Sequence, residues 1–431
     1  MCYDILLLVL SGGFVHNGGM TIPRRKKPGP KRKPKLRSKD IGGAKYLRSV
    51  MDLLRPLHAH KDCPNRTLHF DEYVAYLLLY FFNPIVTSLR GLQQVSTLAK
   101  VRRKLKLPRF SLGSFSEARN VFDPSLLEPL IGALVEEVAD AGLDPRLSAL
   151  DVAATVVDGT AIRALPKMVW ALWRDDEHRA AKVHLEYSLL KAVPTRATVT
   201  DANTSEGRVL RRSVASGKLY VLDRGYADYG LMAAIVEAES SFLVRLHSNA
   251  VYEVLEERPV DAAARARGVE RDMVVKLGCD ASPELHERKV RLIELRVTDP
   301  NALVGRPRKP RVDRKTKTRR TTKTEHVLLL ATDRLDLDAA LVADLYRWRW
   351  QIELFFRWFK TILGADRLIA LSRNGLTLVV YCALIASLLI TLWTGRKPTK
   401  RTYEMLCLYF LGWAEADEVE AHLAKLDAAE H

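Results

Sequence analysis

Hydrophobic side chains recur every three to four positions between residues 41 and 150, which is the spacing of one buried helix face. The clearest examples are residues 70–83 (FDEYVAYLLLYFFN) and 124–143 (PSLLEPLIGALVEEVADAGL). The pattern therefore predicts an all-helical N-terminal domain over residues 41–150. No residue in this domain points to a particular chemistry.

The pattern changes near residue 150, where short runs rich in β-branched and aromatic residues begin. Three adjacent strands are predicted first, and strands then alternate with helices. This order favours a mixed α/β sheet flanked by helices. The predicted strands are 154–160, 181–190, 194–201, 218–225 and 241–248, and the predicted helices are 205–215 and 227–240.

Residues 250–330 break this alternation and are interpreted as a β-rich insertion. They carry four further strand candidates, at 250–257, 272–278, 289–297 and 326–333. After the insertion, the sequence from Asp336 to Thr361 predicts one long helix, with aspartates in its first turns and Gly364 beyond its end.

The most apolar stretch, residues 376–393, is long enough to span a membrane. A fully buried core helix has the same composition, so hydropathy leaves both interpretations open. Near the N-terminus, Ile5–Leu10 are also apolar, but no basic region precedes them, which argues against a signal peptide. Met20 directly precedes a basic segment and is a candidate for the true start.

Positive charge is concentrated in two places. The chain holds 68 Lys and Arg against 51 Asp and Glu, a net charge of +17. Residues 21–40 and 305–323 each contain ten Lys or Arg and one Asp. We expect residues 1–40 to form a disordered basic arm and residues 305–323 a mobile loop. Such concentrated charge favours a polyanionic partner, most simply nucleic acid.

The five cysteines are scattered and show no CxxC spacing, which argues against a disulfide framework or a zinc cluster. Two aspartates are better candidates for chemistry. Asp158 follows an apolar run and precedes Gly159, and Asp223 does the same before Arg224 and Gly225. We expect both at the C-terminal ends of strands, where open α/β sheets place their ligands. Taken singly, each could equally be a turn former or a helix cap.

Four polar residues share one face of the predicted long helix. Tyr346, Arg349, Glu353 and Lys360 fall within an arc of about 60° at 100° per residue. Aromatic residues surround them in the sequence, which suggests that the flanks of the helix are buried and that this polar face opens onto a cleft. A solvated charged stripe is the alternative.

The spacing Y-x2-R-x3-E-x6-K, together with DGT at Asp158 and LDRGY at Asp223, resembles DDE transposases of the insertion-sequence-four type. The resemblance covers about residues 150–395. The helical domain over 41–150 matches only in general character, and for it the resemblance implies DNA binding or dimerisation. It implies a ribonuclease-H-like catalytic domain over 151–395, interrupted by the β-rich insertion at 250–330 and followed by a helical tail over 396–431. It also matches the apolar segment 376–393 to a core helix and so disfavours a membrane span.

The resemblance implies an acidic triad of Asp158, Asp223 and Glu353, which act as catalytic residues and metal ligands. In-line phosphodiester cleavage is assisted by two divalent cations that clamp the attacking and leaving oxygens. We expect two Mg²⁺ ions, with Mn²⁺ as a substitute, because Mg²⁺ prefers carboxylate oxygens. Asp158 is expected to bridge the ions, and mutual repulsion of the acids should leave the site unstable until cations bind.

Tyr346, Arg349 and Lys360 match residues that bind the phosphates of the DNA end. Further phosphate contacts are predicted for residues beside Asp223 and in the second basic run: Arg224, Arg306, Arg308, Lys309 and Arg311. The implied partners are the terminal inverted repeats of the element and target DNA, held by a homodimer on paired ends. A cytoplasmic, nucleoid-associated enzyme without a membrane anchor is expected.

The implied function is Mg²⁺-dependent cleavage of DNA ends followed by strand transfer. Some relatives hold a flipped base with a tryptophan in the insertion, but no Trp occurs between Arg174 and Arg347, so hairpin formation stays open. Three alternatives are an idle copy that only binds DNA, a membrane-anchored DNA-binding protein, and a ribonuclease-H-like nuclease without strand transfer.

Overall fold

The computed structural model describes residues 50–59, 67–83, 85–163, 167–173, 178–278, 285, 288–297, 326–363 and 370–430. They form two compact units. The helical unit contains the described residues up to Phe122, together with Leu392–Gly395 and those from Arg401 onward. The sheet unit contains Asp123–Thr391 and Arg396–Lys400.

Aromatic side chains form the core of the helical unit. They lie on the buried faces of its helices, which the three-to-four-residue spacing of hydrophobic positions predicts. Phe70 stacks on Phe122 with ring centroids 4.7 Å apart, and Tyr73 lies 4.5 Å from Phe115. The Tyr403 hydroxyl donates to a backbone carbonyl at the end of α3, which joins the C-terminal helices to the same core. The helices are α3 (Phe70–Phe81), α4 (Leu89–Thr97), α5 (Ala99–Leu105), α6 (Leu112–Val121), α17 (Lys400–Leu411) and α18 (Ala416–Glu430).

The sheet unit is built on a mixed sheet of nine strands among the described residues, in the order β3-β2-β1-β4-β5-β9-β8-β7-β6. β3, β2 and β1 are antiparallel, whereas β1, β4 and β5 are parallel. This arrangement, flanked by helices, confirms the predicted ribonuclease-H-like fold. The strands are β1 (Ala153–Arg163), β2 (Ala180–Ser188), β3 (Val193–Asp201), β4 (Lys218–Leu222), β5 (Ser241–Arg245), β6 (Tyr252–Arg258), β7 (Val269–Leu277), β8 (Lys289–Val297) and β9 (His326–Thr332).

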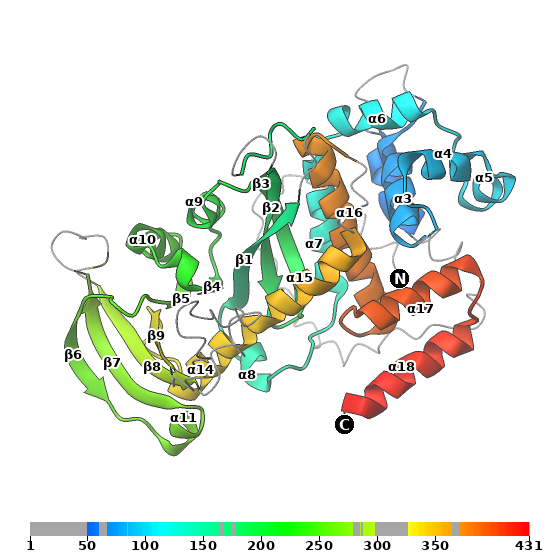
Figure 1. Ribbon diagram of the computed structural model, residues 1–431. Helices are drawn as coiled ribbons and strands as arrows, with labels where there is room; N and C mark the ends of the chain where they lie inside the picture. The colour runs from blue at the N-terminus through cyan, green and yellow to red at the C-terminus, as the bar shows by residue number, and fades with distance from the viewer. Residues whose placement is uncertain are drawn as a thin grey trace, which may run out of the picture. The chain divides into compact units, whose positions relative to one another are not determined.

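The strands predicted for the insertion extend the core sheet. β9 pairs with β5 on one side and with β8 on the other, and β7 and β6 follow outward (Figure 1). A buried ion pair joins β7 to β8, because Arg291 donates to both carboxylate oxygens of Asp272 at 2.8 and 2.7 Å. The insertion is therefore continuous with the core sheet through main-chain hydrogen bonds.

Helices cover both faces of the sheet. Val157 of β1 packs in one apolar cluster with Leu210 of α9 (Glu206–Arg211) and Leu231 of α10 (Tyr229–Glu237). The neighbouring Asp158 points to the opposite face, since successive side chains of a strand alternate. On that face, α15 (Trp350–Leu363) runs along β1, and α14 (Ala339–Trp348) precedes it (Figure 1).

The long helix predicted from Asp336 to Thr361 is instead two consecutive helices that meet at Arg349. Helical geometry begins only at Ala339, because Asp338 serves as the N-cap and accepts a hydrogen bond from the Ala340 N–H. Around Arg349 the bonds tighten to three-residue spacing, since its N–H donates to the Tyr346 carbonyl at 3.2 Å and its carbonyl accepts from Ile352 at 3.2 Å.

The apolar segment 376–393 lies in α16 (Arg373–Thr394). This is the one described helix whose length and composition would allow it to cross a membrane, and 89% of its most apolar window is buried inside the structure. Burial of this extent fits a core helix. Remaining helices of the sheet unit are α7 (Glu128–Glu137), α8 (Pro145–Ser148) and α11 (Ala262–Ala266).

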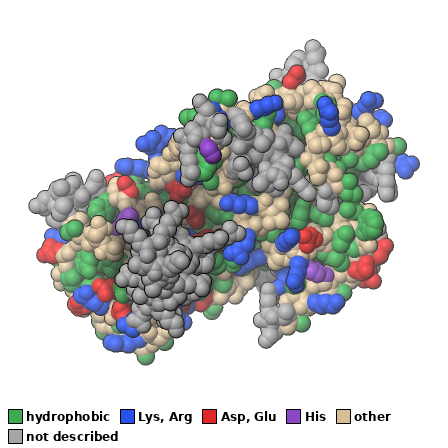
Figure 2. All heavy atoms as spheres, viewed as in Figure 1, with side chains coloured by type: hydrophobic (Ala, Val, Ile, Leu, Met, Phe, Trp, Pro, Cys, Tyr) green, Lys and Arg blue, Asp and Glu red, His purple; other side chains and the backbone are tan. Residues whose placement is uncertain are grey.

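Both basic runs, at 21–40 and 305–323, lie outside the described residues, as does Met20. The phosphate contacts predicted in the second run therefore stay predictions: Arg306, Arg308, Lys309 and Arg311. Figure 2 shows both Lys or Arg and Asp or Glu side chains scattered over the described part of the visible face.

Candidate active site

Asp158 lies in the middle of β1 rather than at its end, which corrects the placement expected from the sequence. The parallel pairing of β1 with β4 stops at Val157 and Leu222, but the antiparallel pairing with β2 continues to Arg163. Asp158 therefore marks the point where β1 and β4 separate. Its Oδ1 accepts the N–H of Gly159 at 2.8 Å.

Asp223 directly follows β4, as predicted. It caps a short 3₁₀ turn (Arg224–Tyr226), and its Oδ1 accepts the Arg224 N–H at 2.7 Å. Its side chain is 37% exposed, and the Arg245 guanidinium at the end of β5 lies 3.9 Å from its Oδ1. Because β1 and β4 are adjacent parallel strands, the two aspartates lie beside the same opening in the sheet.

Arg349 connects the helix to these strands. Its Nη2 donates to Glu353 Oε1 at 2.7 Å, and its Nη1 lies 3.5 Å from Asp158 Oδ2. The guanidinium is almost completely buried, with 3% of the residue exposed. One turn earlier, the Tyr346 hydroxyl donates to Asp223 Oδ1 at 3.2 Å. The break between α14 and α15 thus falls at the residue that bridges two of the acids.

Burial and neighbouring charges shift the ionisation of the site. Burial raises the pKa of Asp158 to about 7, although the charge of Arg349 and the Gly159 N–H both oppose this rise. Burial also raises the pKa of Tyr346 to about 12, and the charge of Asp223 adds to the effect. Burial disfavours the charged form of Arg349, but the surrounding negative charges outweigh it and raise the pKa of the guanidinium.

Lys360 is not brought into this cluster. It lies seven residues beyond Glu353 on α15, about 10 Å along the helix axis, and its side chain is exposed. Partial burial of the amino group lowers its pKa. Arg224 is also exposed, next to Asp223. Both cations are placed where a phosphate in solution can reach them.

The structure adds Glu206 and Arg245, which the sequence analysis did not select. Arg245 is the last residue of β5. Glu206 is the first residue of α9 and forms an ion pair with Lys182 of β2 at 3.3 Å. A glutamate at the first position of a helix is explained by the helix dipole alone, so the sequence carries no sign of its position beside Gly159.

In this arrangement Asp158, Asp223 and Glu353 do not form the metal-binding group that the resemblance implies. Among the described residues, no group of three or more His, Cys, Asp or Glu side chains is close enough to hold an ion. Arg349 lies between Asp158 and Glu353, and Tyr346 and Arg245 contact Asp223. The donors present are carboxylate oxygens, the ligand type that Mg²⁺ prefers.

Comparison with known families identifies residues 153–389, more than half of the chain, as matching the family model described as "Transposase DDE domain". This range contains every acidic residue discussed above. The match confirms the predicted resemblance at the level of the DDE transposases. It leaves the insertion-sequence-four subgroup a prediction.

Similar proteins include transposases of several bacteria. The putative transposase y4zB of Sinorhizobium fredii is 30% identical over 213 residues, which are 49% of this chain and 53% of that protein. The chain thus spans about half the length of this relative. The probable transposase for insertion sequence element IS5377 of Geobacillus stearothermophilus is 22% identical over 69% of this chain and 70% of that protein.

A further relative is the putative transposase InsL for insertion sequence element IS186A of Escherichia coli, 28% identical over 54% of this chain and 64% of that protein. Among solved structures, a piggyBac transposase synaptic complex with hairpin DNA is similar over 90% of this chain and 79% of that chain. Its TM-score is 0.37 at 10% identity.

Proposed function

This chain belongs to the DDE transposase family, and from that premise we propose that it catalyses the movement of an insertion sequence. In this proposal the enzyme hydrolyses DNA at the ends of the element and then joins each freed 3′-hydroxyl to target DNA. The spacing of Tyr346, Arg349, Glu353 and Lys360 along the sequence supports the insertion-sequence-four type. The substrate is double-stranded DNA, comprising the terminal inverted repeats and the target.

The observation that carries the proposal is the bridge made by Arg349. A single buried guanidinium contacts Asp158 on β1 and Glu353 on α15, which are 195 positions apart in the chain. Tyr346 on α14 contacts Asp223 after β4. Acids from two strands and one helix therefore lie around the opening between β1 and β4. A purely structural ion pair does not explain why three acids gather there.

Asp158, Asp223 and Glu353 are the proposed catalytic acids and the proposed ligands of two Mg²⁺ ions, for which Mn²⁺ can substitute. Their oxygens suit these ions, and Arg349 marks a position among them where positive charge is already stabilised. When bound, the ions activate the attacking hydroxyl and stabilise the leaving oxygen. The sheet holds two of the ligands rigidly, and α15 supplies the third.

Arg349, Tyr346, Lys360 and Arg224 are the proposed phosphate-binding groups. Arg349 exchanges its carboxylate partners for a DNA phosphate, which a guanidinium can bind through two parallel N–H donors. Lys360 and Arg224 act as exposed point charges on either side of the acids. Phosphate contacts of this kind position DNA without reading its sequence.

The chemistry consists of two displacements at phosphorus. In the first, a water oxygen forms a bond to phosphorus and the bond to the 3′-oxygen breaks, so that a free 3′-hydroxyl remains on the element. In the second, that hydroxyl attacks a phosphodiester of the target and displaces another 3′-oxygen. Two DNA ends must be held together for this step, which makes a homodimer the proposed assembly.

The test is an assay with DNA carrying the inverted repeats that flank the gene, a target plasmid and Mg²⁺. We expect end cleavage and covalent joining to the plasmid. Glu353→Gln should lower the cleavage rate by roughly a thousandfold or more, as removal of a catalytic group does. Glu237→Gln on the exposed surface of α10 serves as the matched control and should leave the rate unchanged.

Normal end cleavage by Glu353→Gln or by Asp158→Asn would falsify the triad. Cleavage without joining would make the chain a nuclease without strand transfer. Specific binding to the inverted repeats without any cleavage by the parent protein would identify an idle copy.

A further inference from the structure

Glu206 lies at the opening between β1 and β4, on the side of the sheet opposite to Arg349. Its carboxylate occupies the space beside Gly159, where a Cβ atom would lie only 2.6 Å from Oε1. A Cβ on Gly225 would lie 3.8 Å from the other oxygen, Oε2. These are the glycines that follow Asp158 and Asp223 in the sequence. Glu206 therefore extends from α9 across the same opening that the two aspartates flank.

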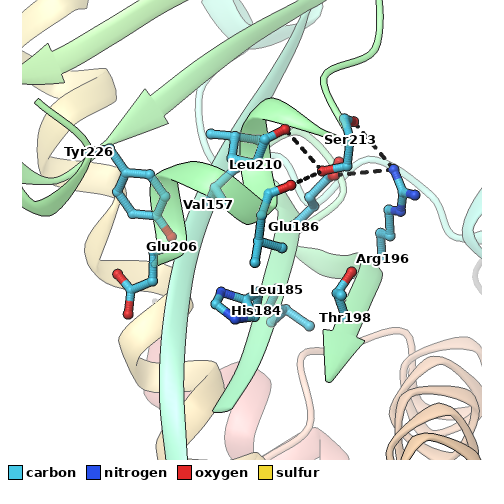
Figure 3. A pocket seen from close by; sticks show the side chains of 11 residues that line it. Val157, His184, Leu185, Glu186, Arg196, Thr198, Glu206, Leu210, Ser213 and Tyr226 are labelled. Atoms are coloured by element: carbon cyan, nitrogen blue, oxygen red, sulfur yellow. Dashed lines mark hydrogen bonds and ion pairs between the residues drawn. The ribbon is translucent and has the colours of Figure 1, made fainter. Parts of the chain in front are cut away.

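A buried hydroxyl faces the same place. Tyr226 is 1% exposed, and its hydroxyl has no hydrogen-bond partner among the described residues. Glu206 and Tyr226 are among the residues that line a cavity of about 10 Å³, and Figure 3 shows both of them there. A cavity of this size holds about one water molecule. A buried hydroxyl without a partner costs free energy, which favours a polar guest at this position.

We propose that Glu206 is a fourth acidic residue of the cation site, which acts through a water molecule shared with Tyr226, while Lys182 partly neutralises its charge. This inference rests on the proposed function, because it assumes that Asp158 binds a divalent cation. Mg²⁺ commonly keeps several waters of hydration in proteins, and an outer carboxylate can bind one of them. Glu206 is accordingly a positioning residue, since it acts through water and through its charge.

Two substitutions should move cation affinity in opposite directions. Glu206→Gln keeps the shape of the side chain and removes its charge, so Mn²⁺ should bind roughly tenfold more weakly. Lys182→Met removes the neutralising cation 3.3 Å from Glu206, so Mn²⁺ should bind about threefold more tightly. A purely structural Lys182–Glu206 pair predicts lower thermal stability for both variants and no such opposite change in affinity.

The experiment is calorimetric titration of the full chain with Mn²⁺ in the absence of DNA, with circular dichroism to verify folding. Glu237→Gln is the matched control and should bind Mn²⁺ like the parent. Asp158→Asn tests the underlying proposal and should weaken binding more than Glu206→Gln does.

Parent-like affinity in both Glu206→Gln and Lys182→Met, with weakened binding in Asp158→Asn, would overturn the role of Glu206 and leave the proposed function standing. Parent-like affinity in Asp158→Asn would instead contradict the proposed cation site itself. If Glu206→Gln does not fold, Lys182→Met decides alone, because tighter binding supports the inference and unchanged binding overturns it.

Discussion

The carboxyl group of Asp158 is held where its charge is disfavoured. Burial raises its pKa from 3.8 to about 7, even though Arg349 lies 3.5 Å away. In the proposed enzyme, a bound cation offsets the free-energy cost of ionising this buried carboxyl group. Without a cation, the ionised form of Asp158 is unfavourable, mainly because it is buried. The sequence analysis expected instability from repulsion among the acids, and Arg349 relieves part of that repulsion.

We expect the cation-free chain to lose stability through Asp158 as the pH rises from about 4 to about 7. The folded state keeps a proton on this group up to a pKa of about 7, whereas the unfolded chain releases it near 3.8. The folded state thus binds more protons in this window, and each pKa unit of difference is worth about 1.4 kcal/mol. Above pH 7 the effect is constant.

Asp158→Asn should remove this slope and should be more stable than the parent above pH 7, as measured by urea unfolding with a chelator present. Burial lowers the pKa of His184 to about 4, which contributes an opposite slope between pH 4 and 6.5. The comparison is therefore between variant and parent. An identical pH profile in both proteins would show that Asp158 ionises normally.

Sequence reasoning could select Asp158 and Asp223 because a glycine follows each of them closely and both follow apolar runs. It could not select Glu206, because the approach of α9 to Gly159 is a property of the fold and leaves no local pattern. It also placed Asp158 at the end of a strand. The sequence does not show that β1 continues beyond Val157, the last residue that pairs with β4, by pairing with β2 alone.

At the scale of elements, the junction of α14 and α15 is the feature that sequence reasoning missed. The stretch around Arg349 contains no glycine or proline, so its composition predicts an uninterrupted helix. In the structure Arg349 contacts acids of β1 and α15, and the helical hydrogen bonds tighten at that residue. Strand candidates in the insertion were easier to predict, because β7 and β8 are rich in valine, leucine and isoleucine.

Within the insertion, β7 is joined to β8 by the buried pair of Arg291 and Asp272, whose side chains are each 3% exposed. Asp272→Asn leaves the Arg291 charge buried without its counterion. We expect it to lower the free energy of unfolding by about 3–5 kcal/mol, as measured by urea unfolding.

Glu257→Gln is the matched control for this prediction. It removes an exposed partner of Arg271, in the same part of the sheet, and should cost less than about 1 kcal/mol. Equal costs for the two variants would mean that burial does not strengthen the Arg291–Asp272 pair.

For the whole molecule, charge is distributed unevenly between the described surface and the two basic runs. The described face carries both signs of charge. Residues 21–40 and 305–323 each have a net charge of +9, and together they exceed the net charge of +17 of the whole chain. Long-range attraction to DNA should therefore come largely from these runs.

The mixed α/β architecture could be predicted from the hydrophobic pattern of the sequence. The order of the strands across the insertion could not, because pairing between distant strands leaves no local pattern in the sequence.

Deletion of residues 306–323 should weaken DNA binding equally for specific and unrelated sequences and should flatten its dependence on salt. The deletion removes ten Lys or Arg, and each phosphate that is no longer neutralised reduces the slope of log affinity against log salt by about 0.9. Fluorescence anisotropy titrations with DNA, at salt concentrations from about 50 to about 200 mM, measure this slope. An unchanged slope would contradict a role of this run in DNA binding.

The tightened turn at Arg349 precedes α15, which carries Glu353, whereas Asp158 and Asp223 belong to the sheet. Asp158 and Asp223 are carried by neighbouring strands and move together, whereas Glu353 follows the direction of α15. A change of bend at this single turn alters the distance from the third acid to the other two without disturbing the sheet. In the proposed enzyme, bending of α15 at this turn assembles or separates the three acids, so that a chain that has not bound the ends of its element does not cleave the DNA of its host.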